Sequence, residues 1–288
     1  MKNHAIVFFI SIASVSFASW QQIGSDINGE AAGDSSGISV AISADASTVA
    51  IGASGNNGNG DYAGHVRVYN LAFAQGITIA DSTWTQLGSD IDGEAAGDGF
   101  GYRLDISSDG TIVAIAASYK PLGYVGVYQY DPTSADWTKI GSNIVGEDID
   151  GFGQSVAISS DGTRVVIGAP FNNDFTGAVR VYEYDGTDWI QLGSDIDGEA
   201  TGNNSGGSID ISADGTIVVI GAQSNDDNGN NAGHARVYQY DPTAADWIQL
   251  GSDIDGEAAG DLFGRSVAIS SDNPPDLFVA IGATGNDG

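Results

Sequence analysis

The sequence contains no cysteine, so disulfide bonds, thiol nucleophiles and a cysteine-linked copper cofactor are all excluded. Basic residues are also scarce, with 9 Lys and Arg against 38 Asp and Glu and a formal net charge of −29. Such a charge repels nucleic acids and anionic membranes and attracts cations and basic surfaces. We therefore expect no nucleic-acid partner.

Long hydrophobic runs are absent except near the N-terminus. There, "AIVFFISIASVSFA" (Ala5–Ala18) follows Lys2 and ends in the small-residue pattern Ser16-Phe17-Ala18. At about 14 residues it is shorter than the ~20 that span a bilayer, and it has the features of a signal peptide. The sequence predicts a signal peptide over residues 1–18 and a mature chain over 19–288 with no membrane insertion after signal removal. The alternative is a simple N-terminal membrane anchor. We expect a secreted or cell-surface protein.

The chain is rich in repetition. "LGSDIDGEAAGD" occupies Leu87–Asp98 and recurs almost unchanged at Leu250–Asp261, with further copies that begin at Ile23, Ile140 and Leu192. Each copy follows one of the five tryptophans, which are Trp20, Trp84, Trp137, Trp189 and Trp247. A period near 50 residues with short apolar runs in every unit favours a propeller or an array over a single sandwich.

The third unit shows the predicted strands most clearly. Gln154–Ser159 and Arg164–Ala169 are short β-branched runs joined by Ser-Asp-Gly-Thr, which is a strong hairpin signal. Ala178–Tyr184 and Trp189–Ile196 follow as two further strands. The sequence therefore predicts an all-β β-propeller of four-stranded antiparallel blades, with four full blades and a partial fifth. The expected blades are about 38–91, 102–144, 153–196 and 206–254, with the partial one at 264–288.

A family resemblance adds to this prediction. "GFGQSVAISSDGTRVVIGAP" (Gly151–Pro170) resembles the FG-GAP repeat, the blade unit of integrin α-chain propellers, with Phe152-Gly153 and Gly168-Ala169-Pro170 in the named places. Parts of the motif recur at Phe100-Gly101, Phe263-Gly264, Gly52-Ala53, Gly221-Ala222 and Gly282-Ala283. The hairpin Val127–Gly141 looks instead like a Kelch blade, although Gly-Ala stands where Kelch repeats carry Gly-Gly. Both families are propellers.

The repeated acidic loops are the candidate binding site. In a four-stranded blade, the loop from the fourth strand to the next blade lies at the same end as the loop between the second and third strands. Carboxylates and amides therefore gather on one face, and Ca²⁺ prefers six to eight such oxygens. The candidate metal ligands are Asp90, Asp92, Glu94, Asp98, Asp195, Asp197, Glu199, Asp253, Asp255, Glu257 and Asp261. The alternative is that Asp and Gly here only form turns.

The resemblance implies a different calcium site, which this chain lacks the residues to build. Calcium-binding FG-GAP blades hold the ion in the loop between the first and second strands, through several Asp or Asn residues. Here that loop is as short as "SSDGT" (Ser159–Thr163), with one carboxylate. We therefore do not expect the integrin-type calcium site.

No catalytic constellation stands out from the repeats. Of the three histidines, His4 lies in the predicted signal peptide, while His65 and His234 occupy one repeat position, as structural residues do. Lys120 and Lys139 are the lysines of the mature chain, and no carboxylate pair differs from its repeat copies. The sequence predicts that the protein is not an enzyme.

The predicted function is a binding or adhesion module that engages a protein or glycan partner through the acidic loop face, with Ca²⁺ as the assisting ion. One alternative is a structural or salt-adapted surface repeat protein without a specific ligand. An enzyme acting on polysaccharide ranks third.

Overall fold

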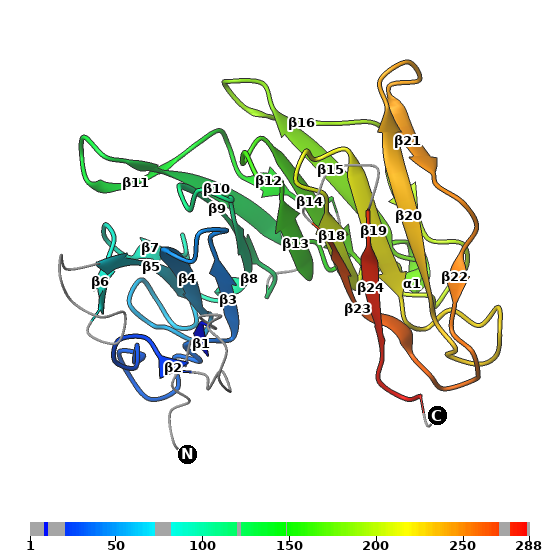
Figure 1. The fold of residues 1–288 in the computed structure, drawn as a ribbon, viewed down its shortest axis with the longest axis horizontal. Coiled ribbons are helices and arrows are strands. Elements are labelled where there is room, and N and C mark those ends of the chain that lie inside the picture. The colour runs from blue at the N-terminus through cyan, green and yellow to red at the C-terminus, as the bar shows by residue number, and fades with distance from the viewer. Residues whose placement is uncertain are drawn as a thin grey trace, which may run out of the picture.

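The structure is a computed structural model that describes residues 9–10, 21–72, 82–119, 122–147, 149–270 and 277–286 (Figure 1). The described elements are strands, apart from one turn of helix, α1 (Asn172–Phe175). Within the described ranges, no helix has the length and apolar character to cross a membrane. The predicted signal peptide lies outside the described residues except at β1 (Phe9–Ile10), which pairs with β2 (Gln21–Gln22).

Four antiparallel sheets share one topology, in which each strand pairs with the next along the chain. The first sheet has the order β3 (Ser39–Ile42), β4 (Thr48–Ala53), β5 (His65–Ala72) and β6 (Thr83–Gln86). The second contains β8 (Phe100–Ile106), β9 (Ile112–Ala117), β10 (Tyr124–Asp131) and β11 (Asp136–Lys139). The third contains β13 (Ser155–Ile158), β14 (Arg164–Ala169), β15 (Ala178–Tyr184) and β16 (Trp189–Gln191). The fourth contains β18 (Ser208–Ile211), β19 (Ile217–Ala222), β20 (His234–Asp241) and β21 (Asp246–Gln249).

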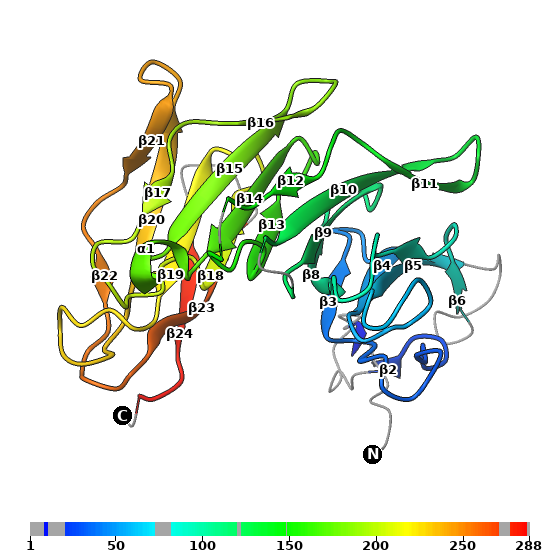
Figure 2. The same cartoon turned by 180° about the vertical axis from the view of Figure 1, so that it is seen from behind.

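A smaller fifth sheet pairs β23 (Phe263–Ile269) with β24 (Val279–Ala283). The prediction of an all-β propeller with four full blades and a partial fifth is confirmed. Figures 1 and 2 show the sheets following one another along an arc, and β23 packs against β18 and β19 of the fourth sheet.

The outermost strand of each full blade is split into two pieces. After the Gly-Ser of the repeat, a short second piece of the strand pairs again with the third strand. In the first blade, for example, β7 pairs with β5 and Asp92 lies opposite His65. These second pieces are β7 (Ile91–Asp92), β12 (Ile144–Val145), β17 (Ile196–Asp197) and β22 (Ile254–Asp255). The split places the acidic residues of each repeat beside the start of the third strand.

The core lies between blades rather than within them. The second strands β4, β9, β14 and β19 are buried along almost their whole length. Each of β9, β14 and β19 lies between two neighbouring sheets, whereas Val49 and Ile51 of β4 pack with Ile27 of the segment before the first blade. Phe100 and Phe152 are fully buried and pack with the aliphatic side chains of the adjacent blade. Small or β-branched apolar side chains pack well in the narrow space between two sheets, which accounts for the Val, Ile and Ala content of these strands.

The FG and GA motifs meet where two blades approach each other most closely. Ser39 Oγ donates to the carbonyl oxygen of Gly101 at 2.7 Å, and a Cβ on Gly52 would lie only 2.1 Å from that oxygen. The same arrangement joins Ser208, Gly221 and Gly264. The motif is therefore the contact by which one blade holds the next.

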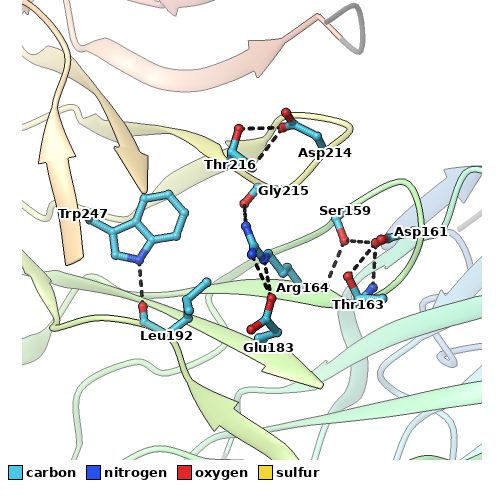
Figure 3. A network of polar contacts seen from close by, with 10 residues as sticks. All are labelled: Ser159, Asp161, Thr163, Arg164, Glu183, Leu192, Asp214, Gly215, Thr216 and Trp247. Carbon is cyan, nitrogen blue, oxygen red and sulfur yellow. Dashed lines mark hydrogen bonds and ion pairs between the residues drawn. The ribbon is translucent and has the colours of Figure 1, made fainter. Parts of the chain in front are cut away.

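A tryptophan joint links the outer edges of neighbouring blades. Trp189 Nε1 donates to the carbonyl of Ile140, and Trp247 Nε1 donates to the carbonyl of Leu192 (Figure 3), at 2.9 and 2.8 Å. The preceding Asp188 accepts the backbone N–H of Ser142 in the previous repeat at 2.7 Å. These contacts account for the repeated Trp-x-x-Leu-Gly-Ser pattern.

At the opposite end from the acidic loops, the hairpin turns are closed by aspartates (Figure 3). Asp161 Oδ1 accepts hydrogen bonds from Ser159 Oγ and from the backbone N–H and hydroxyl of Thr163, all within 2.9 Å. Arg164 then joins two blades, because it pairs with Glu183 at 2.8 Å and donates to the carbonyl of Gly215 at 3.0 Å.

Candidate functional site

The acidic loops and the asparagine-rich loops lie at one end of the blades and contact each other. Asn59 Nδ2 donates to the carbonyl of Gly93 at 2.7 Å, and in the fourth blade Asn228 Nδ2 donates to that of Gly256 at 2.6 Å. We call this end the acidic loop face. It consists of the described residues in 23–37, 87–99, 140–152, 192–205 and 250–262 and in the loops between second and third strands, 54–64, 118–123, 170–177 and 223–233.

A cluster of one histidine and three carboxylates forms where the fourth blade meets the loop that precedes it. His234 is the first residue of β20, Asp227 lies in the loop before it, and Asp253 lies between β21 and β22. Glu199 reaches in from the preceding acidic loop. One ligand atom from each of the four side chains lies within 4.8 Å of the others.

The histidine of this cluster is almost completely buried, with 1% of its surface exposed. Its Nδ1 lies 3.7 Å from Glu199 Oε2 and 3.8 Å from Asp253 Oδ2. Neither ring nitrogen has a hydrogen-bond partner among the described residues. Burial and, next, the guanidinium of Arg236 lower the pKa of His234, so the imidazole is neutral near pH 7. Burial raises the pKa of Glu199. The positive charge of Arg236 lowers that pKa, and the negative charges of Asp253 and Asp227 raise it further, so the overall shift is upward.

The first blade carries the equivalent cluster with one carboxylate fewer. His65 Nδ1 lies 3.4 Å from Asp90 Oδ2 and 4.0 Å from Glu30 Oε2. Aligned on the two histidines, Gly58 stands where the fourth blade has Asp227. In the described part of the chain, these two clusters are the groups of three or more potential ligands with metal-like spacing.

In the second and third blades, a cation of the protein itself occupies the corresponding place. Arg180 pairs with Asp195 at 2.8 Å, Asp150 at 3.1 Å and Glu147 at 3.5 Å. In the second blade, Lys139 pairs with Glu94 at 2.6 Å. At both places a cation of the protein offsets part of the carboxylate charge.

The structure places the sequence-predicted ligands in several different surroundings. Asp90, Asp253 and Glu199 join the histidine clusters. Asp98 and Asp261 cap their own loops by accepting the N–H of Ala95 and Ala258, while Glu94 and Asp195 pair with Lys139 and Arg180. Asp92, Asp197 and Asp255 lie on the short strands β7, β17 and β22, and Glu257 is exposed.

Sequence reasoning missed the other members of the clusters. Glu30 comes from a loop that is distant in sequence from His65, so no local spacing marks it, and Asp227 lies in the loop just before His234, where Asn and Gly surround it and no ligand spacing stands out. The histidines themselves were set aside because they recur. The available signal was that His65 and His234 replace Tyr124 and Ala178 of the other blades at a position facing the acidic loop.

A separate pocket lies along the first strands of the blades. Its volume is about 360 Å³, and its lining residues include Tyr102, Arg103, Gln154, Phe171, Asn204, Gln223 and Arg265. Arg103 stacks over Tyr102 at 4.2 Å from the ring centre, and Arg265 Nη1 donates to Gln223 Oε1 at 2.6 Å. Within the described ranges, neither guanidinium lies at ion-pair distance from a carboxylate. Asp105, two residues beyond Arg103 on β8, has its pKa raised to about 7 by burial.

This pocket is where the repeats diverge. The residue after the Gly of the FG motif is Ile38, Tyr102, Gln154, Gly207 or Arg265 in successive blades. Arg103 also stands at the position where the other full blades have a serine that donates a hydrogen bond to the next blade, as Ser39 does. In the second blade Ser118 Oγ donates this hydrogen bond instead, to the carbonyl oxygen of Gly153 at 2.7 Å.

Comparison with known proteins agrees with the fold. Residues 145–182 match the FG-GAP repeat, which confirms the predicted resemblance. The comparison with curated proteins gave no significant match. Among solved structures, a putative 6-phosphogluconolactonase from Bacteroides fragilis has 12% identity and a TM-score of 0.53, over 95% of this chain and 61% of that one. The periplasmic gluconolactonase PpgL of Pseudomonas aeruginosa has 17% identity and a TM-score of 0.52, over 84% of this chain and 64% of that one.

The chain thus carries an FG-GAP repeat in a β-propeller fold, and it spans about three fifths of the length of these two structures. They contradict the prediction that the protein is not an enzyme, because two propellers of similar fold are named as lactonases. The prediction rested on the symmetry of histidines and carboxylates in the loops. It overlooked the first strands, where the symmetry is broken by arginines.

Proposed function

We propose that this protein is an exported binding module that engages a protein or glycan partner through the acidic loop face. The observation that carries the proposal is the gathering of acidic and asparagine-rich loops from successive blades on one end. The negative electrostatic field of these loops attracts basic surfaces, and their carboxylates and amides form hydrogen bonds with sugar hydroxyls.

The exported location rests on two supports. The N-terminal sequence has the features of a signal peptide, and the absence of cysteine leaves stability independent of the redox state of the compartment. One structure of similar fold is named as periplasmic.

Calcium is the assisting ion expected from the sequence. However, the carboxylates within one acidic loop contact different partners, so they do not together form a cation site. Among the described residues, the candidate cation sites are instead the two histidine clusters, where carboxylates of separate loops converge beside an imidazole, and Ca²⁺ is kept as a variable of the binding test.

The test is a glycan array and a panel of basic peptides, probed with the native protein in buffer that contains CaCl₂ or EGTA. The variant Asp90→Asn/Asp92→Asn/Glu94→Gln removes three charges from the acidic loop face. A control variant, Asp131→Asn/Asp185→Asn/Asp241→Asn, removes three charges from hairpins at the opposite end. We expect the first variant to lose at least tenfold in affinity for any captured probe and the control to retain it. Equal retention by both variants would overturn the proposal, as would the capture of no probe by the native protein.

A second candidate function, a hydrolase acting on a lactone or a related sugar acid, is favoured by the pocket at Arg103 and Arg265. Two guanidinium groups without a carboxylate partner in the described ranges suit an anionic or carbonyl-bearing ligand. Asp105, two residues beyond Arg103 on β8 and outside the pocket lining, has its pKa raised by burial to about 7, in the range of a general base near neutral pH. The assay is hydrolysis of gluconolactone above its spontaneous rate. Turnover that is lost in Asp105→Asn and weakened in Arg265→Gln would support it, and a rate equal to buffer alone would exclude this substrate.

A further inference from the structure

We propose that Glu199, Asp227, His234 and Asp253 form a binding site for a borderline divalent cation of the Zn²⁺ or Co²⁺ class, with His234 Nδ1 as the nitrogen ligand. The inference goes beyond the proposed function, since it concerns an ion bound by the protein alone.

The unpartnered histidine is the first argument. A buried polar group is normally hydrogen-bonded, and one without a partner destabilises the fold. Both nitrogens of His234 lack such a partner among the described residues, although Nδ1 faces two carboxylates. Distances of 3.7 and 3.8 Å are too long for a hydrogen bond. In a tetrahedral site with metal–ligand bonds of about 2.1 Å, neighbouring ligand atoms lie about 3.4 Å apart, so the observed spacing leaves room for an ion.

Neighbouring side chains orient the ligands. Gln249 Nε2 donates to Asp253 Oδ1 at 2.6 Å, which leaves Oδ2 directed at the histidine. Asn225 Nδ2 donates to Asp227 Oδ2 at 3.1 Å, and its own oxygen accepts the Asp227 N–H at 2.9 Å. Arg236 lies 3.6 Å from Glu199 Oε1, while Oε2 faces the histidine. Such outer contacts fix the ligands of metal sites in proteins.

The other blades provide an internal comparison. Where the protein supplies its own cation, at Arg180 or Lys139, the histidine is replaced. Where the histidine is present, the arginine of the same strand makes no closer contact with a carboxylate than 3.6 Å in the fourth blade and 3.8 Å in the first. Within the described ranges, Arg236 is the arginine or lysine at ion-pair distance from these three carboxylates, and it reaches Glu199 and neither Asp227 nor Asp253.

The nitrogen ligand decides the class of ion. Ca²⁺ and Mg²⁺ select oxygen ligands, whereas imidazole with carboxylates suits Zn²⁺ and the neighbouring transition metals. The first blade has Glu30, His65 and Asp90 but Gly58 in place of the fourth ligand, so it forms a weaker version of the same site.

The experiment is calorimetric titration of metal-free full-length protein with ZnCl₂ and, separately, CaCl₂, together with the visible absorption of bound Co²⁺. We expect one tight Zn²⁺ site, with Ca²⁺ at least a hundredfold weaker there. His234→Ala should abolish that site and its Co²⁺ spectrum. Asp227→Gly, which copies the first blade, should weaken the site roughly tenfold. Gly58→Asp should strengthen the first-blade site by a similar factor.

Two further variants keep the result interpretable. Asp253→Asn should weaken Zn²⁺ binding, while Asp195→Asn, its counterpart in the third blade, should leave it unchanged. Thermal melts without metal check that each variant is folded, and if His234→Ala is not, Asp227→Gly and Glu199→Gln carry the test. The inference is overturned if the native protein takes up no Zn²⁺, if the cluster variants bind as the native does, or if Ca²⁺ binds this site as tightly as Zn²⁺.

Discussion

At the scale of the residue, one aspartate organises the hairpin turn between the first and second strands of each full blade. Asp45, Asp109, Asp161 and Asp214 accept hydrogen bonds from the Ser two residues before and from the Ser or Thr two residues after. Burial alone would raise the pKa of Asp161, but the hydrogen bonds from Thr163 and Ser159 lower it overall. The folded state therefore binds fewer protons at this carboxyl than the unfolded chain does.

This shift gives a prediction with a definite sign. The stabilisation by ionised Asp161 is fully present above the unfolded pKa of 3.8 and is lost as the pH falls through the lower folded value. We expect Asp161→Ala to cost about 1 kcal/mol at pH 7, as the loss of a capping side chain does, and less below pH 3.5. Thermal melts from pH 7 to pH 3 measure the difference, with Asp161→Asn as a control that retains one acceptor. A difference that grows at acidic pH would contradict the assignment.

At the scale of the element, the contact between neighbouring blades depends on a missing side chain. Gly221 lies on β19, and the carbonyl oxygen of Gly264 in the next blade would lie 2.1 Å from an added Cβ. Ser208 bonds to that same oxygen at 2.7 Å. The two blades therefore touch through backbone atoms, which cannot move aside as a flexible side chain can.

We therefore expect Gly221→Ala to destabilise the fold by about 1–3 kcal/mol, the usual cost of overpacking a well-packed core. Gly207→Ala is the matched control, because a Cβ there would meet its nearest neighbour at 3.3 Å and the residue has no positive φ. Denaturant unfolding of both variants provides the comparison. Equal stability of Gly221→Ala and the control would show that the blades are not held at this contact.

Sequence reasoning was most accurate where the repeat itself carries the structural signal. The Asp-Gly turns, the alternating strands and the Trp-x-x-Leu-Gly-Ser pattern are local, and they gave the predicted hairpins, strands and repeat period. The candidate site was different because its members are separated along the chain. Glu199 and His234 lie 3.7 Å apart only after two blades have packed together. The ligand prediction named Asp90, Glu94 and Asp98 of one loop together, but Asp90 contacts His65 of the first blade while Glu94 contacts Lys139 of the second.

At the scale of the whole molecule, the dominant feature is the charge. A formal net charge of −29 is distributed over a fold that concentrates many carboxylates at one end. Internal cations neutralise part of that end at Arg180 and Lys139, but the first and fourth blades retain clustered carboxylates around a buried histidine. Repulsion of this kind destabilises the compact state and is reduced by ionic screening.

The stability of the whole protein should therefore rise with salt. Raising NaCl from 20 mM to 500 mM shortens the Debye length from about 20 Å to about 4 Å, so repulsion between loops of neighbouring blades is largely screened. With a chelator present to remove divalent ions, we expect the melting temperature to increase by several degrees, since about 1 kcal/mol corresponds to ~2–4 °C for a chain of this size class. Choline chloride at equal concentration should give the same increase, because screening does not depend on the identity of the cation. An increase with NaCl alone would instead indicate specific Na⁺ binding, and a constant melting temperature in both salts would show that the carboxylates on the acidic loop face do not strain the fold.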